Sequence, residues 1–107
     1  MLTRFQQFQP RVAEDSLLYR NASPFPHIVL DEFLTPSALA AAMADFPRPE
    51  AISDWRRMDT TDADGLVATV NKLGYSNEFA FGPTLRGLVH ELNAGPFIRY
   101  LEKLTGI

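Results

Sequence analysis

Large apolar residues recur with helical spacing in three proline-led segments of the chain. Segments 36–46 and 83–92 carry them at positions i, i+3, i+4 and i+7, which is the spacing of one helical face. Segment 96–105 places its apolar residues on one face and its charged residues, Arg99, Glu102 and Lys103, on the other. We therefore predict three helices, with the apolar stripes Leu39, Ala42, Met43 and Phe46; Leu85, Leu88, Val89 and Leu92; and Phe97, Ile98, Leu101 and Leu104.

Capping residues stand at the ends of these segments. The hydroxyl of Thr35 can accept a hydrogen bond from a free amide of the first turn, and proline is favoured at the next position because its missing amide would have no partner there. Pro47 cannot continue the first helix. Asn93–Gly95 closes the second helix, and Gly106 stands where a left-handed residue would end the third.

A short apolar run, His27–Phe33, precedes the first of these helices. Pro24 and Pro26 favour an extended approach to it, and Ile28, Val29 and Leu30 form its centre. A β-branched run of this length favours a buried strand with both faces covered, although periodicity alone does not distinguish it from a buried helical turn. We predict the strand, with Asp31 and Glu32 closing it.

The remaining segments complete a predicted α+β fold. We expect one domain, possibly partial, over 1–107: a loose arm at 1–10, a helix–strand–helix unit at 11–46, a loop and strand connector at 47–82, and a helical corner at 83–107. Within 11–46, residues 11–21 form the first helix. In the connector, WRRM is interpreted as a strand, GLVATVNKL as a strand or helical turn, and GYSNEFAFGP as an extended loop over the core, with Trp55 as a core or rim anchor. The short helices then pack on a small sheet or strand edge.

The composition of the chain argues against several classes of function. The chain has 107 residues and a formal net charge of −3, so nothing favours binding to nucleic acid or to an anionic membrane. It has no cysteine, which excludes disulfides and thiolate catalysis and fits a reducing compartment. The N-terminus lacks the features of a signal peptide, and no apolar run is long enough to span a membrane. We therefore expect a cytoplasmic protein.

Two stretches carry a resemblance to a known family. PFPHIVLDEFLTP, followed by a helix ending in DFP, resembles the N-terminal region of prolyl-4-hydroxylase-like Fe(II)/2-oxoglutarate-dependent dioxygenases. LRGLVHELNAGPFIRYLEKLTGI resembles the helical segment that precedes their catalytic barrel, a double-stranded β-helix (jelly roll). The resemblance implies an N-terminal scaffold, truncated or encoded alone. It also implies a parent oxidoreductase, a hydroxylase that uses Fe(II) and 2-oxoglutarate with the assistance of ascorbate.

The iron ligands of that family are absent from the sequence. A mononuclear iron oxygenase needs two histidines and a carboxylate, which the family supplies as His-x-Asp or His-x-Glu and a distant histidine. This chain has only His27 and His90, and the residues two positions later are Val29 and Leu92. The family's downstream arginine or lysine for 2-oxoglutarate is missing as well. We therefore assign no catalytic, cofactor-binding or metal-binding residue, and we expect no cofactor bound by this chain and no dioxygenase activity from it alone.

The remaining candidate residues have structural interpretations. His27 lacks the partners that a ligand or general base needs. His90 and Glu91 match the start of a zincin motif, but Ala94 stands where the second histidine belongs, and both residues are expected to face solvent. The stretch TTDADG matches half of a calcium loop through Asp62, Asp64 and Gly65, but Thr60 and Asn71 replace two required carboxylates; we expect a solvated acidic loop.

Two function hypotheses follow. The first is a non-catalytic N-terminal scaffold of a dioxygenase, whose partner is the catalytic barrel or another protein chain that covers an apolar helical face. The second is a free-standing α+β protein-interaction module. A scaffold fragment should leave the stripes of 83–105 partly uncovered and prone to self-association, whereas an independent domain should bury them.

Overall fold

The computed structural model describes residues 1–51, 55–57, 60–61, 63–65, 67–69 and 73–107. Its helices are α1 (Phe5–Phe8), α2 (Val12–Asn21), α3 (Pro36–Asp45), α4 (Pro83–Leu92) and α5 (Gly95–Thr105), with short 3₁₀ turns η1 (Gln9–Arg11), η2 (Pro49–Ala51) and η3 (Glu78–Ala80). Its strands are β1 (Arg56–Arg57), β2 (Thr60–Thr61), β3 (Val67–Thr69) and β4 (Leu73–Gly74).

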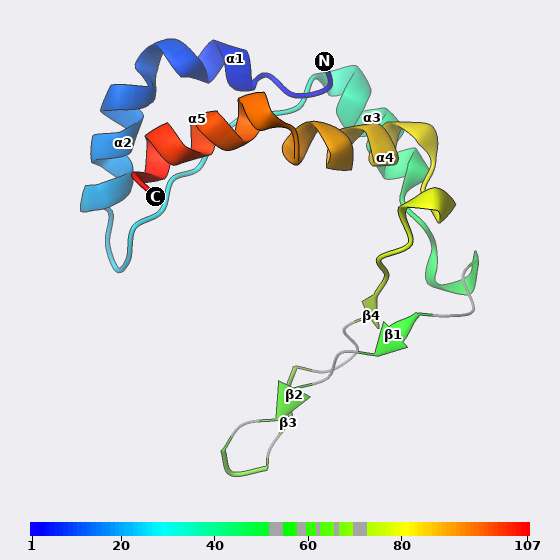
Figure 1. Cartoon of the computed structure of the whole chain (residues 1–107). Coiled ribbons are helices and arrows are strands. Elements are labelled where there is room, and N and C mark those ends of the chain that lie inside the picture. Colours follow the sequence, from blue (N-terminus) through cyan, green and yellow to red (C-terminus); the bar gives the residue numbers. More distant parts are fainter. Residues whose placement is uncertain (52–54, 58–59, 62, 66, 70–72) are drawn as a thin grey trace.

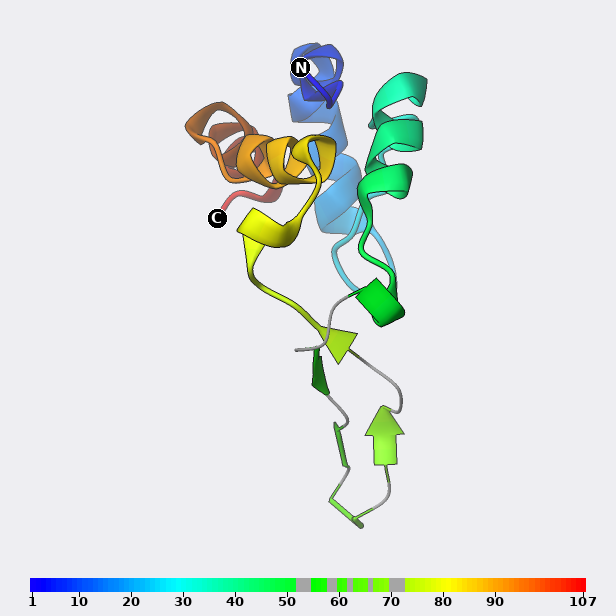
Figure 2. The ribbon, with the colours of Figure 1, turned by 90° about the vertical axis from the view of Figure 1, so that its right-hand side faces the viewer.

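The helices form an all-α body, so the predicted α+β fold is wrong. In the part of the chain that the structure describes, no strand lies among the helices. The four short strands form two antiparallel ladders, β1 with β4 and β2 with β3, which project away from the helical body (Figures 1 and 2). The helices therefore pack on one another and not on a sheet.

The predicted strand at 27–33 is wrong as well. Residues 27–30 form no regular element, and a turn follows at 31–32. Among the described residues, pairing with the N-terminal segment is limited to one isolated antiparallel bridge, Thr3 with Leu34, flanked by the hydrogen bonds Arg4 N to Phe33 O (2.7 Å) and Thr35 N to Leu2 O (3.2 Å). Ile28 and Leu30 pack against the core, whereas Val29 is 75% exposed, so only one face is covered. The β-branched run therefore serves as an extended strap.

The predicted helix boundaries are confirmed by their caps. The Thr35 hydroxyl accepts a hydrogen bond from Ala38 N at 3.2 Å, Pro36 opens α3, and the helix ends at Asp45, before Pro47. Helices are also found where 11–21, 83–92 and 96–105 were predicted. Gly106 ends α5 with φ of 76°, the left-handed conformation that glycine adopts without a steric cost.

The N-terminal residues belong to the core, so the prediction of a loose arm at 1–10 is wrong. Phe5 is 2% exposed and packs edge-on against Phe97, with ring centroids 5.6 Å apart. Two aromatic residues three positions apart fit one face of a helical turn, which the polar residues between them obscured in the sequence. The core cluster consists of Phe5, Phe8, Phe97, Tyr100 and Leu104, with Val12, Ile28, Leu30, Phe33, Leu92 and Leu101 packed against it.

The helices associate in two pairs, α2 with α5 and α3 with α4 (Figure 1). The aromatic core lies beside the first pair, with Phe5 and Phe8 from α1 and Phe97 and Tyr100 from α5. In the second pair, the α4 stripe is only partly buried, and none of its residues is fully covered. No helix among the described residues is long and apolar enough to cross a membrane.

The connector contains a small aromatic cluster outside the main core. The Trp55 ring lies 5.3 Å from that of Tyr75, which lies 6.2 Å from Phe81, and Trp55 Nε1 donates to Pro49 O at 3.0 Å. Of the two roles predicted for Trp55, a core anchor or a rim anchor, the structure agrees with the second, because the ring packs in this outer cluster. The expectation that GYSNEFAFGP covers the core is wrong in part: the segment contains η3, and Phe79 is 79% exposed.

Candidate functional site

The outer side of α3 carries large apolar side chains that nothing in the described part of the chain covers. Leu39, Met43 and Phe46 are 49%, 70% and 63% exposed, and we call them the α3 apolar face. Ala38 and Ala42 are buried instead, so the helix turns its small residues inward. The predicted stripe of Leu39, Ala42, Met43 and Phe46 is therefore split: Ala42 faces inward, and the three large residues face outward. The exposed apolar patch expected on 83–105 lies mainly on α3.

A groove extends this face toward the connector. It has a volume of about 490 Å³ and is lined by Met43, Ala44, Phe46, Pro47, Arg48, Pro49 and Trp55. Prolines and aromatic rings form much of its wall, and Arg48 is its charged member. The face and the groove together form a surface of the kind that binds another apolar surface.

Asp45 explains why the small side of α3 faces α4. Its Oδ2 accepts hydrogen bonds from Thr84 N at 2.6 Å and Leu85 N at 3.1 Å, two amides of the first turn of α4. A carboxylate at a helix N-terminus is also favoured by the helix dipole. A β-carbon on Gly82 would collide with this carboxylate, so glycine is required for the close approach. Sequence reasoning missed this contact, because its partners are about forty positions away along the chain.

Glu91 performs a similar function for the N-terminus, and the prediction that it faces solvent is wrong. Its Oε2 accepts from Leu2 N at 2.9 Å, and its Oε1 accepts from Thr3 N at 3.0 Å and from the Thr3 hydroxyl at 2.6 Å. Desolvation by burial acts to raise the pKa of Glu91, but the hydrogen bonds from Thr3 and Leu2 outweigh it and lower the pKa below its ordinary value. The carboxylate therefore ties the first residues to α4.

The two histidines lie in local, exposed contacts. Nδ1 of His27 is 2.8 Å from Phe25 O, and Nε2 of His90 is 2.7 Å from Glu78 Oε2. His90 is exposed, as predicted. In 1–51 and the other described segments, no group of three His, Cys, Asp or Glu side chains could hold a metal ion.

The acidic candidates of the sequence are located as follows. Asp31 and Glu32 form a turn instead of ending a strand; Glu32 adopts φ of 55° and lies 3.5 Å from Arg4 Nη1. In TTDADG, Thr60 and Thr61 form β2 and Gly65 adopts φ of 79°. Asp62 and Asn71 lie outside the described residues, so the comparison with a calcium loop stays at the level of the sequence.

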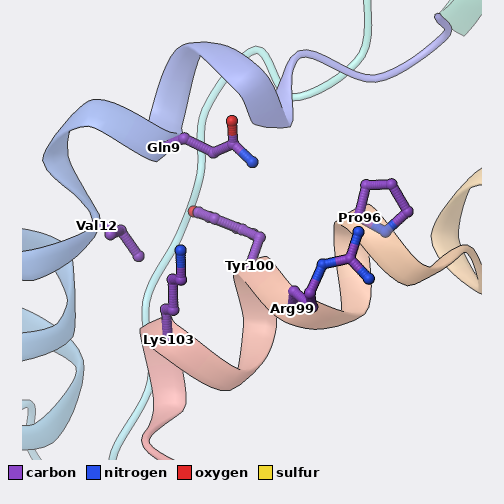
Figure 3. Close-up of a pocket in the computed structure, with 6 residues that line it drawn as sticks. All are labelled: Gln9, Val12, Pro96, Arg99, Tyr100 and Lys103. Atoms are coloured by element: carbon purple, nitrogen blue, oxygen red, sulfur yellow. The ribbon is translucent and has the colours of Figure 1, made fainter.

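A second cavity lies between α5 and the η1–α2 corner. Its volume is about 280 Å³, and it is lined by Gln9, Val12, Pro96, Arg99, Tyr100 and Lys103 (Figure 3). Arg99 and Lys103 are exposed, as predicted. Tyr100 is only 1% exposed and belongs to the core, which the predicted stripe of 96–105 did not include. Its position, three residues after Phe97 and four before Leu104, is the signal that could have placed it there.

Comparison with known proteins adds no relative. No family model, no curated protein and no solved structure matches this chain.

Proposed function

We propose that this chain is a non-catalytic helical scaffold that docks through the α3 apolar face onto the catalytic barrel of an Fe(II)/2-oxoglutarate-dependent dioxygenase. The resemblance of PFPHIVLDEFLTP and of the C-terminal helices to such scaffolds supports the kind of partner. The observation that carries the proposal is the orientation of α3: Ala38 and Ala42 are buried against the chain's own helices, while the large apolar residues point outward.

The helical body holds this face in a fixed position. The Asp45 carboxylate joins α3 to the first turn of α4, and Glu91 joins α4 to the N-terminal segment. Because the first contact fixes α3 on α4 and the second fixes α4 on the N-terminal segment, α3 meets a partner as part of a rigid surface. Full burial of an exposed large apolar side chain stabilises by roughly 1.5–3 kcal/mol. Leu39, Met43 and Phe46 are 49%, 70% and 63% exposed, so covering each of them contributes part of that amount to binding.

The chain's own residues do not fit an Fe(II) site. Both histidines are engaged in local contacts, and the described residues contain no cluster of three possible ligands. In the proposed assembly the barrel supplies the metal, the cosubstrate and the chemistry, and this chain supplies a docking surface.

A chimera tests the proposal. This chain replaces the N-terminal helical segment of a prolyl-4-hydroxylase-like dioxygenase, and succinate formation is followed with Fe(II), ascorbate, 2-oxoglutarate and the enzyme's substrate. The chimera should be active, while the barrel without any N-terminal segment and this chain alone should form no succinate.

Matched variants identify the surface used. The α3 variant (Leu39→Ser, Met43→Ser and Phe46→Ser) should lose activity and barrel binding in the chimera. The surface control variant carries the same change at three exposed apolar residues elsewhere (Leu17→Ser, Leu18→Ser and Val29→Ser) and should behave like the parent chimera. Equal activity of the two variants would contradict docking through α3.

A second candidate function is a free-standing helical module that binds a different protein through the same face. The closed aromatic core favours it, since Phe5 and Tyr100 are 2% and 1% exposed without any partner. The isolated chain would then melt cooperatively and remain monomeric at high concentration without binding a hydrophobic dye. Self-association and dye binding that the α3 variant abolishes would favour the scaffold.

A further inference from the structure

The side of α5 next to its core-facing stripe carries charged residues and lines a cavity; Tyr100 belongs to both sides. Pro96, Arg99, Tyr100 and Lys103 follow one another at i, i+3, i+4 and i+7 and line the cavity opposite Gln9 and Val12 (Figure 3). The cavity volume of about 280 Å³ corresponds to roughly nine water molecules at their share of liquid volume. It can therefore hold a small organic molecule.

The Tyr100 hydroxyl is the buried polar group of this cavity. Its oxygen is enclosed, and no residue in the described part of the chain forms a hydrogen bond with it. Buried hydroxyl groups almost always have a partner, because an unmade hydrogen bond is costly. Burial, together with the negative charge of Asp15, raises the pKa of Tyr100, although Arg11 opposes the shift. The hydroxyl thus keeps its proton and can donate it to an acceptor that the chain itself does not supply.

The charges around the cavity are positive. Arg99 and Lys103 border it, and none of its six lining residues is acidic. The neighbouring acid, Asp15, accepts from Arg11 Nε at 3.1 Å, so its charge is paired with an arginine of the same helical corner. The Arg99 guanidinium lies over the start of α5, since Nη1 would be 3.0 Å from a β-carbon at Gly95. These groups suit a negatively charged acceptor.

The side chains that enclose the hydroxyl can move to admit a ligand. Gln9 and Lys103 are both exposed, and both are long enough to rotate away from the cavity. Gln9 can also donate through its amide. Val12 and Pro96 add an apolar wall, so the cavity combines donors at one side with a surface for a hydrocarbon group.

We propose that this cavity binds a small organic anion, whose carboxylate or phosphate group accepts hydrogen bonds from the Tyr100 hydroxyl, Arg99 and Lys103 while its apolar part contacts Val12 and Pro96. Charge-assisted hydrogen bonds of this kind are the stronger class. The site is separate from the α3 apolar face, so it does not depend on the docking function proposed above.

Nuclear magnetic resonance of the full ¹⁵N-labelled chain tests the proposal. Inorganic phosphate, phenyl phosphate and benzoate are titrated separately at constant ionic strength, with sodium chloride as the reference. Saturable shifts confined to residues 9–12 and 96–103 are expected for phenyl phosphate, for benzoate or for both. Comparing the affinities for phenyl phosphate and benzoate shows whether the site prefers a phosphate or a carboxylate group. Comparing the affinities for phenyl phosphate and inorganic phosphate measures the contribution of the apolar wall.

Three variants make the test specific. Arg99→Gln with Lys103→Gln should weaken the binding at least about tenfold, and Tyr100→Phe by about tenfold, with dispersed spectra in both cases. Arg20→Gln with Arg56→Gln removes two exposed positive charges elsewhere and should leave the affinity unchanged. The absence of saturable shifts with all three anions would overturn the proposal, as would equal affinity in the cavity variants and the charge control.

Discussion

Removing the hydroxyl of Tyr100 should stabilise the free chain. Tyr100→Phe preserves the ring that packs 6.0 Å from Phe97 and 6.1 Å from Phe5, so the change leaves the aromatic core in place. It deletes one oxygen that is enclosed and has no hydrogen-bond partner among the described residues. The substitution therefore removes a polar group that lost its water on folding and gained nothing in return.

The expected gain is set by the cost of an unmet polar group. A buried donor without a partner costs about 1–3 kcal/mol, so the free energy of unfolding should rise by about 1 kcal/mol or more. For a domain of this size, 1 kcal/mol corresponds to roughly 4–8 °C in Tm. The rise should appear in thermal melts and in urea unfolding followed by circular dichroism, in a buffer free of organic anions and phosphate.

Tyr19→Phe is the matched control. Tyr19 lies on α2 and is only half-buried, so its hydroxyl can bind water and its removal should change Tm little. A loss of stability in Tyr100→Phe larger than that of the control would refute the reasoning, because it would show that the Tyr100 hydroxyl forms a stabilising hydrogen bond in the free chain. The anion site would then lose its buried donor.

Two carboxylates give further predictions. Asp45→Ala should lower the free energy of unfolding by about 1–2 kcal/mol in urea titrations, because two amides of the first turn of α4 lose their acceptor; exposed Asp31→Ala is the control, and equal effects would contradict the role of Asp45. Glu91→Gln should flatten the acid limb of stability against pH. Because the folded pKa of Glu91 lies below its ordinary value, its contribution is fully present above that ordinary value and is lost as the pH falls through the folded pKa; an unchanged acid limb in the variant would contradict this.

Local signals in the sequence were sufficient to place the helices. Thr35 followed by Pro36, and Gly106 after a charged last turn, define ends through the chemistry of one or two neighbouring residues. The apolar periodicity between these ends needs no knowledge of the rest of the chain. For this reason four helices of ten or eleven residues were predicted close to their observed bounds.

The prediction of a strand at 27–33 was wrong because a strand forms only beside a hydrogen-bonded partner strand. Ile28, Val29 and Leu30 suit a pleated, half-buried surface, but pleating without a neighbouring ladder produces only an extended strap. The residues that contact this strap lie near the N-terminus, where Phe5 and Phe8 were separated by polar residues. Nothing in the local pattern of 1–10 showed that these two rings belong to the core.

The two structural carboxylates were missed for a related reason. Glu91 accepts from residues 88 and 89 positions earlier in the chain, and no spacing rule connects such partners. Their sequence neighbourhood suggested a metal motif for Glu91 and nothing for Asp45. The burial of Tyr100, by contrast, could have been predicted from helical spacing, since this residue lies on the same side of α5 as Phe97 and Leu104.

The orientation of α3 shows how packing selects which of two helix faces is buried when both have the same helical spacing in the sequence. Ala38 and Ala42 have the same helical spacing as Leu39 and Met43. Only the alanine side lets the backbone come close enough for Asp45 to reach the amides of α4 past Gly82. Leaving the large residues outside forgoes several kcal/mol of apolar burial, which is a large fraction of the roughly 5–15 kcal/mol that stabilises an ordinary domain. A partner that covers the α3 apolar face would return this energy as binding, and by mass action it would also raise the stability of the whole helical body.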